Sequence, residues 1–311
     1  MSSRVSLSRA LFIVLLIGCL TPWMSAPAAL FTGLIFSFLF GNPFSEITKK
    51  GTGLLLRASV VGLGFGIHAD KALEAGSKGF IFTVVTIAGT LLLGYLISKW
   101  LRIESKTSHL ISCGTAICGG SAIAAVAPVI KAEQNQISVA LGTVFILNAV
   151  SLFVFPVIGH FFHLSQSQFG IWAAIAIHDT SSVVGASGKY GAEAMQIATT
   201  VKLARALWII PVVFLSAMAF KNREAKVSIP YFILLFLVAM LINSYVPGIA
   251  PVSDVITFIA KKGIIVTLFL IGSDLSKETL RSVGFKPFFQ GILLWVIVSV
   301  SSLLIIMETV T

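Results

Sequence analysis

Long apolar stretches of the segment Ile175–Val213 surround a group of ionisable and hydroxyl side chains. These polar residues are His178, Asp179, Thr180, Ser181, Ser182, Lys202 and Arg205. In an apolar span such residues are costly and mark a pathway for polar substrates. Lys202 and Arg205 are three positions apart and therefore share one face of a helix. One carboxylate against two cations leaves excess positive charge, and the simplest missing partner is an anionic substrate.

The sequence leaves other arrangements of these charges open. Asp179 and Lys202 could form an ion pair that locks two helices, with Arg205 reaching the lipid interface. His178 could carry a proton, because its ordinary pKa is near neutrality, or it could be a satisfied hydrogen-bonding residue. Arg57 lies near the middle of a third apolar span, where it either joins the site or extends toward the interface.

A second polar interruption precedes this segment. Gly114, Gly119 and Gly120 cluster in the apolar span 108–130, beside Ser121 and before Pro128. Glycine and proline disfavour a helix interior by about 1 and 3 kcal/mol. The pattern predicts a discontinuous helix, whose exposed N–H groups at the second half favour anions. Close packing of helices through small residues is the alternative.

The composition predicts an all-α polytopic membrane protein. Of the 311 residues 57% are hydrophobic and 11% charged, and the mean hydropathy is +0.99. Soluble domains carry about 25% charged residues. The apolar stretches approach the length of about twenty residues that a helical span needs, which excludes a β-barrel with its shorter alternating strands. About eleven spans are predicted, roughly at 8–24, 27–41, 52–68, 79–99, 108–130, 137–160, 168–188, 194–219, 229–246, 254–273 and 287–307.

Basic residues are scattered through the short loops, so the net charge of +10 does not indicate nucleic-acid binding. They are more frequent on the side of the N-terminus, which predicts a cytoplasmic N-terminus. The loop residues behind this prediction include Lys49, Lys50, Lys99, Arg102, Lys106, Lys221, Arg223, Lys226, Lys277, Arg281 and Lys286. The first 30 residues are either a first transmembrane helix or a cleaved signal peptide.

Weak internal symmetry accompanies the two interruptions. Ile117, Ser121, Ala132, Glu133, Gln136 and Ile137 recur at an offset of 60 as Ile177, Ser181, Ala192, Glu193, Gln196 and Ile197. His178-Asp179-Thr180 thereby stand where Cys118-Gly119-Gly120 stand. Repeats with a substrate site at their interface are typical of secondary transporters. We predict a single transporter domain, 1–311, with repeats over 27–160 and 168–311 that are inverted; chance similarity between apolar sequences is the alternative.

Five segments around these interruptions and in the neighbouring spans form distinctive motifs: GTAICGGSAIAAVAPVIKAE from Gly114, IHDTSSVVGAS from Ile177, VKLARALWIIPV from Val201, LLRASVVGLGFGI from Leu55 and LFLIGSDLSKETLRSVGFKPFFQG from Leu268. These motifs resemble those of the YeiH family of proposed sulfate exporters. The similarity runs from about Phe31 to the C-terminus. It implies a multi-pass transporter of the bacterial inner membrane, with sulfate or a related oxyanion as substrate. It also suggests kinship with antiporter-like folds, in which a core with crossed broken helices moves against a second bundle.

We therefore expect a secondary active transporter that moves a small anion by alternating access. The expected substrate site comprises Arg57, Gly119, Gly120, Ser121, His178, Asp179, Thr180, Ser181, Ser182, Lys202 and Arg205. One alternative is a symporter of an organic anion, coupled to H⁺ or Na⁺ through His178 and Asp179; another is a passive anion channel. The oligomeric state stays open, a homodimer included.

An enzyme is disfavoured, because adjacent helix positions do not face one another as a catalytic triad requires. The chain has no HExxH motif and no P-loop, and we expect no cofactor. Its cysteines, Cys19, Cys113 and Cys118, predict neither a disulfide framework nor a metal site.

Overall fold

The structure, a computed structural model, describes residues 2–220, 231–274 and 284–310. These residues form helices joined by short turns, and no strand occurs among them. The prediction of an all-α polytopic protein is confirmed. Within these described ranges, five helical stretches are long and apolar enough to cross a membrane: 83–101, 135–161, 192–219, 250–274 and 285–309. Lys221, Arg223, Lys226, Lys277 and Arg281, which contribute to the predicted orientation, lie outside the described residues.

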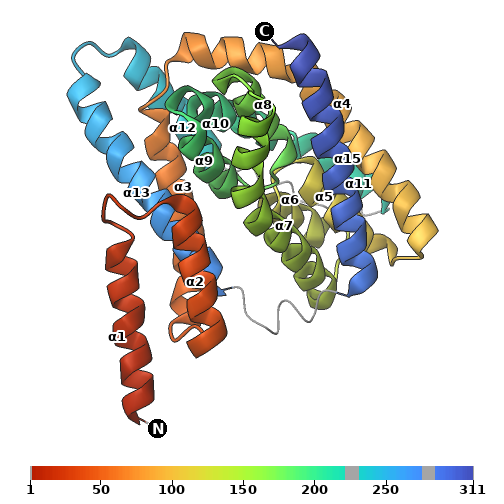
Figure 1. Cartoon of the computed structure of the whole chain (residues 1–311). Helices are drawn as coiled ribbons and strands as arrows, with labels where there is room; N and C mark the ends of the chain where they lie inside the picture. Colours follow the sequence, from red (N-terminus) through yellow and green to blue (C-terminus); the bar gives the residue numbers. More distant parts are fainter. Residues whose placement is uncertain (1, 221–230, 275–283, 311) are drawn as a thin grey trace.

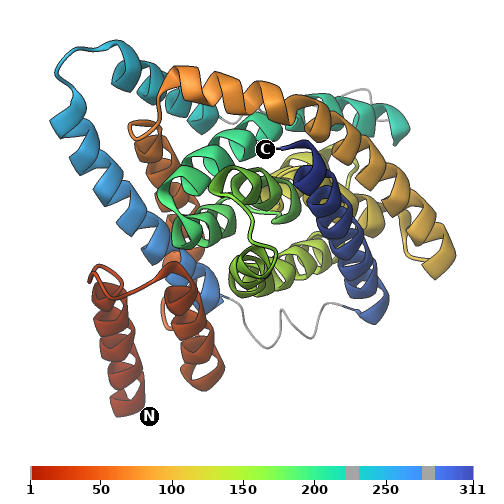
Figure 2. The same cartoon turned by 45° about the horizontal axis from the view of Figure 1, so that its top comes forward.

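One group of helices, here named the panel, lies to one side of the molecule (Figure 1). Within it α13 packs against both α2 and α3, and α12 packs against α3. The panel helices are α1 Ser2–Gly18, α2 Ala26–Phe40, α3 Ser45–Gly64, α12 Tyr231–Tyr245 and α13 Ala250–Asp274. Segments from the first and the last third of the chain therefore build the panel, as the view along a second direction also shows (Figure 2).

Small residues bring the panel helices into backbone contact. A methyl group on Gly33 of α2 would overlap the carbonyl oxygen of Phe269 on α13. A methyl group on Gly272 of α13 would likewise overlap the carbonyl oxygen of Leu30 on α2. Since any side chain at either position would separate the two helices, their close crossing depends on glycine at both.

The second group, here named the core, holds both predicted interruptions. Figure 2 shows the long helix α4 running from the panel side across to the core. Most of the fully buried side chains belong to the core, including Trp172, Lys202 and Arg205. The core helices are α4 Ala69–Leu101, α5 Ser105–Ala116, α6 Gly120–Val129, α7 Gln134–Phe161, α8 Gln166–Ala176, α9 Thr180–Tyr190, α10 Ala192–Ala206, α11 Ile209–Ala219 and α15 Phe285–Thr309.

Two spans are discontinuous, as predicted. Helices α5 and α6 are separated at Ile117–Gly119, and α8 and α9 are separated at Ile177–Asp179. The residues that begin the second halves, Gly119 and Asp179, stand at the same offset of 60 as the sequence similarity. Each broken pair is followed by another helix, α7 or α10. The extent of the repeats, 27–160 and 168–311, stays a prediction.

The span predicted over 194–219 contains a further break that the apolar pattern did not reveal. It consists of α10 and α11, which are separated by Leu207 and Trp208. Pro211 in the first turn of α11 has no N–H group, so it cannot donate to the carbonyl of Leu207. The N–H of Ile210 donates to that carbonyl instead, at 3.2 Å, so an i→i−3 hydrogen bond interrupts the α-helical pattern there.

Candidate functional site

The two interruptions touch one another in the core. Gly119 adopts φ 65° and ψ −123°, a conformation that residues with a side chain rarely adopt. A methyl group on it would lie 3.4 Å from the carbonyl oxygen of His178 and 3.5 Å from Cβ of Asp179. The backbone therefore turns at Gly119 directly against the second break, and the two broken spans meet at their middles.

Arg205 stabilises the end of the first half-helix. Its Nε donates to the carbonyl oxygen of Ala116, the last residue of α5, at 2.8 Å. Its Nη1 donates to Oγ1 of Thr86 on α4 at 3.0 Å. A helix C-terminus carries about half a negative charge and favours a cation there. Arg205 is fully buried, so this carbonyl end has a cation in place of water.

Lys202 stabilises the end of the first half-helix in the second broken span. Its Nζ donates to the carbonyl oxygens of Ile177, at 2.7 Å, and Ala174, at 3.3 Å, at the end of α8. The N–H of His178 donates to Oδ1 of Asn148 on α7 at 3.1 Å. Since Lys202 and Arg205 are both on α10, one helix holds the carbonyl ends of both broken spans.

Asp179 occupies the start of α9. Its Oδ1 accepts from the N–H of Ser182 at 2.8 Å and from Oγ of Ser181 at 2.5 Å, and its Oδ2 accepts from Oγ of Ser182 at 2.7 Å. This is an N-cap with two added hydroxyl donors. An ion pair between Asp179 and Lys202 is absent from this part of the described structure, because each group is satisfied by other partners.

The start of α6 differs, because its N-cap residue is Gly119, which has no side chain to accept from the N–H groups of the first turn. The first N–H to bond within this turn is that of Ile123, which donates to the carbonyl of Gly119. The N–H groups of Gly120 and Ser121 precede it and have no intrahelical acceptor. Together with the helix dipole, such groups favour an anion.

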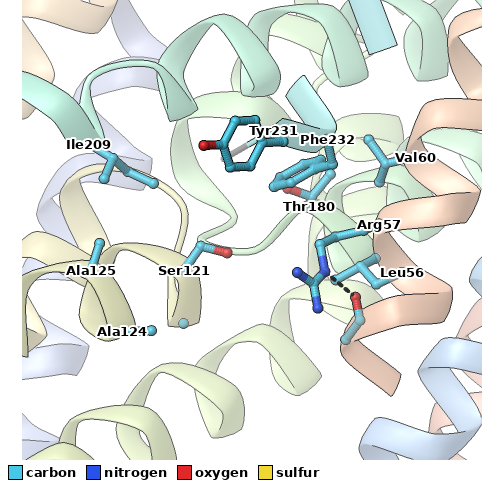
Figure 3. Close-up of a pocket in the computed structure, with 12 residues that line it drawn as sticks. Leu56, Arg57, Val60, Ser121, Ala124, Ala125, Thr180, Ile209, Tyr231 and Phe232 are labelled. Carbon is cyan, nitrogen blue, oxygen red and sulfur yellow. Dashed lines mark hydrogen bonds between the residues drawn. The ribbon is translucent and has the colours of Figure 1, made fainter. Parts of the chain in front are cut away.

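This uncapped helix start faces a cavity of about 520 Å³ between the core and the panel (Figure 3). Thr180 at the start of α9 also faces it. Arg57 on α3 reaches into it from the panel, and its Nε donates to the carbonyl of Gly53 at 2.9 Å. The lining residues are Gly53, Leu56, Arg57, Val60, Gly120, Ser121, Ala124, Ala125, Thr180, Ile209, Tyr231 and Phe232.

The eleven residues predicted for the site thus separate into two sets. Arg57, Gly120, Ser121 and Thr180 line the cavity. Gly119, His178, Asp179, Ser181, Ser182, Lys202 and Arg205 build the two breaks beside it. The His178 ring is fully buried, and neither ring nitrogen has a hydrogen-bond partner among the described residues.

Comparison with known proteins places this architecture in a family. Residues 9–291 match the family described as "Conserved hypothetical protein 698". The chain is 53% identical to a UPF0324 membrane protein of Bacteroides thetaiotaomicron, over 90% of this chain and 86% of the relative. It is 49% identical to UPF0324 membrane proteins of Photobacterium profundum and Bdellovibrio bacteriovorus, over 96% of this chain and 92% and 93% of theirs. The chain belongs to the YeiH family of UPF0324 membrane proteins. No solved structure matches it.

Several residues of this YeiH-family site escape sequence reasoning. Tyr231, Phe232 and Ile209 line the cavity, yet they are apolar or aromatic residues of apolar spans and carry no distinguishing signal. Thr86 and Asn148 are different, because a polar residue in an apolar span is a visible signal. The sequence does not show their partners, which are the Arg205 side chain for Thr86 and the backbone N–H of His178 for Asn148.

Proposed function

We propose that this protein is a secondary active transporter of a small oxyanion such as sulfate, which works by alternating access in the bacterial inner membrane with its N-terminus in the cytoplasm. The observation that carries the proposal is the composition of the cavity. Its polar lining consists largely of donors: the guanidinium of Arg57, the helix start at Gly120 and the hydroxyls of Ser121 and Thr180. Guanidinium, backbone N–H and hydroxyl groups together suit a tetrahedral oxyanion.

The division of these donors between the panel and the core supports a transport cycle. Arg57 belongs to the panel, whereas Gly120, Ser121 and Thr180 belong to the core. An anion bound by donors of both the panel and the core would favour the arrangement in which the two groups of helices lie close together. Displacement of the core against the panel would separate the donors and weaken binding, which is the change of affinity that alternating access requires.

Lys202 and Arg205 enter the proposal as positioning residues rather than ligands. Their donors point at the carbonyl ends of α5 and α8, on the far side of each break from the helix starts. By stabilising both ends they allow the broken spans to persist within a buried core. Asp179 keeps the start of α9 occupied, and this leaves the start of α6 as the anion position.

The test is counterflow of radiolabelled sulfate in proteoliposomes, with sulfonates and carboxylates as competitors. Arg57→Gln removes one charge-assisted hydrogen bond, worth about 1.5 kcal/mol or more, and should raise the KM roughly tenfold or more. Arg102→Gln is the matched control, because Arg102 is exposed at the end of α4 and lies outside the cavity. Unchanged KM in Arg57→Gln, or flux that does not saturate with any of these anions, would contradict the proposal. Flux that depends on a Na⁺ or H⁺ gradient would assign coupling.

A further inference from the structure

A second, smaller cavity of about 40 Å³ lies in the same boundary between core and panel. Its lining includes Leu63 at the end of α3, Gly66 just beyond that end, Gln196 and Thr199 in the first half of α10, and Thr257 and Lys261 of α13. The large cavity contacts α3 only up to Val60. The small one begins one helical turn later, so the two cavities follow one another along α3.

The two cavities face opposite ends of the panel. The large cavity includes Tyr231, the first residue of α12, whose side chain is largely exposed. The small one is built where α3 ends and α10 begins. Because α3 runs from one end of the panel to the other, a path along it would connect the two. In the present structure the cavity beside Arg57 has a volume of about 520 Å³ and the one beside Lys261 only about 40 Å³.

The lining of the small cavity is suited to an anion. The ammonium group of Lys261 is exposed and makes no hydrogen bond or ion pair within the described ranges. The hydroxyl of Thr257 is buried, and it has no hydrogen-bond partner among the same residues. A single water molecule would satisfy that hydroxyl in a cavity of this size, so a water-filled packing defect is the competing explanation.

One hydrogen bond crosses the boundary at this point. Nε2 of Gln196 on α10 donates to the carbonyl oxygen of Gly66, just beyond α3, at 2.9 Å. Gln196 is on the same helix as Lys202 and Arg205, which hold the two breaks. A movement of α10 relative to the panel would therefore break this bond and, at the same time, rearrange the substrate site.

We propose that the small cavity is the closed opposite mouth of the anion path, with Lys261 and Thr257 as a second anion-binding station and the Gln196–Gly66 hydrogen bond holding it shut. This inference rests on the proposed function, since it supplies the second opening that alternating access needs. The ligand at this station is the same small oxyanion that binds beside Arg57.

Cysteine labelling tests the mouth without any transport measurement. The native cysteines are buried, so Thr257→Cys and Ser121→Cys can be compared in the otherwise unchanged protein with a membrane-impermeant thiol reagent. We expect Ser121→Cys to react from one side of the membrane and Thr257→Cys, slowly, from the other. Adding Gln196→Ala should speed the reaction of Thr257→Cys at least several-fold. Reaction of both cysteines from one side, or an unchanged rate with Gln196→Ala, would overturn the inference.

Flux measured from each side tests the binding station. Lys261→Gln should raise the sulfate KM several-fold from the side that labels Thr257→Cys, and less from the other side. The adjacent Lys262→Gln is the control, because the Lys262 ammonium contacts the carbonyl of Thr21 and lies outside the cavity. An equal effect from both sides, or none, would refute the station. Absence of anion flux in the unmodified protein would refute the proposed function instead, and the labelling results would still report on the mouth.

Discussion

Replacing Gly119 by alanine tests whether the contact between the two breaks depends on one backbone conformation. At φ 65° and ψ −123° a residue with Cβ is strained by about 1–3 kcal/mol. The added methyl group would also lie 3.2 Å from Cγ1 of Val144, which must shift slightly. Gly120 provides the matched control. It begins α6, and a methyl group there would make only ordinary contacts of 3.4 Å and more with Phe145 and Leu141.

The neighbouring replacement Gly120→Ala should be neutral or stabilise by about 0.4–1 kcal/mol, because alanine restricts the unfolded chain. Because this unfolded-chain effect is common to both replacements, the two variants should differ by the strain at Gly119, about 1–3 kcal/mol in the free energy of unfolding. At roughly 2–4 °C per kcal/mol this is a difference of roughly 2–12 °C in melting temperature, measurable by thermal unfolding in detergent. Sulfate counterflow should also fall in Gly119→Ala, because the contact between the two breaks positions the substrate site. Equal melting temperatures would show that the break does not depend on the glycine conformation.

Three further replacements test the other elements of the site. Asp179→Ala removes the cap of α9 and should lower the free energy of unfolding by about 0.5–2 kcal/mol, with most of the loss recovered in Asp179→Asn. Lys202→Met should change anion affinity less than Arg57→Gln, measured by ligand-induced thermal shift; a larger loss of affinity would make Lys202 a ligand. Gly33→Val should destabilise by about 1–3 kcal/mol or more through overpacking against α13. Gly89→Val, with nothing within 4 Å of the added carbon, is its control, and equal melting of the two would contradict the backbone contact.

The breaks could be predicted because their chemistry is local. Glycines and a His-Asp pair in the middle of apolar spans conflict with an uninterrupted helix, and the conflict is visible within a few residues. The offset of 60 relates the two breaks within the sequence itself, because matching residues flank both. The kink at Leu207–Trp208 also has a local cause in Pro211, but one proline among apolar residues is equally compatible with a bent continuous helix.

The roles of the buried cations could not be predicted, because they depend on which group each cation faces. Sequence reasoning balanced Lys202 and Arg205 against Asp179 alone. The structure adds the carbonyl ends of α5 and α8, which the sequence does not show as charges. Similarly, the position of Arg57 opposite the start of α6 follows from packing between panel and core, which joins residues far apart in the chain.

When the helix dipoles are counted, the site still has an excess of positive charge, but that charge lies at different groups. Each helix end carries a charge equivalent to roughly half an elementary charge. The carbonyl ends of α5 and α8 offset about one of the two charges on Lys202 and Arg205, and Asp179 offsets the other. The starts of α6 and α9 then add roughly one positive charge, before the exposed Arg57 is considered. Of the two helix starts, that of α9 is capped by the Asp179 side chain, whereas Gly119 provides no side-chain cap for α6, so the start of α6 is the one whose N–H groups can bind an anion at the cavity. An anionic substrate is therefore favoured by this helix start and by Arg57, rather than by the buried lysine and arginine side chains that first suggested it.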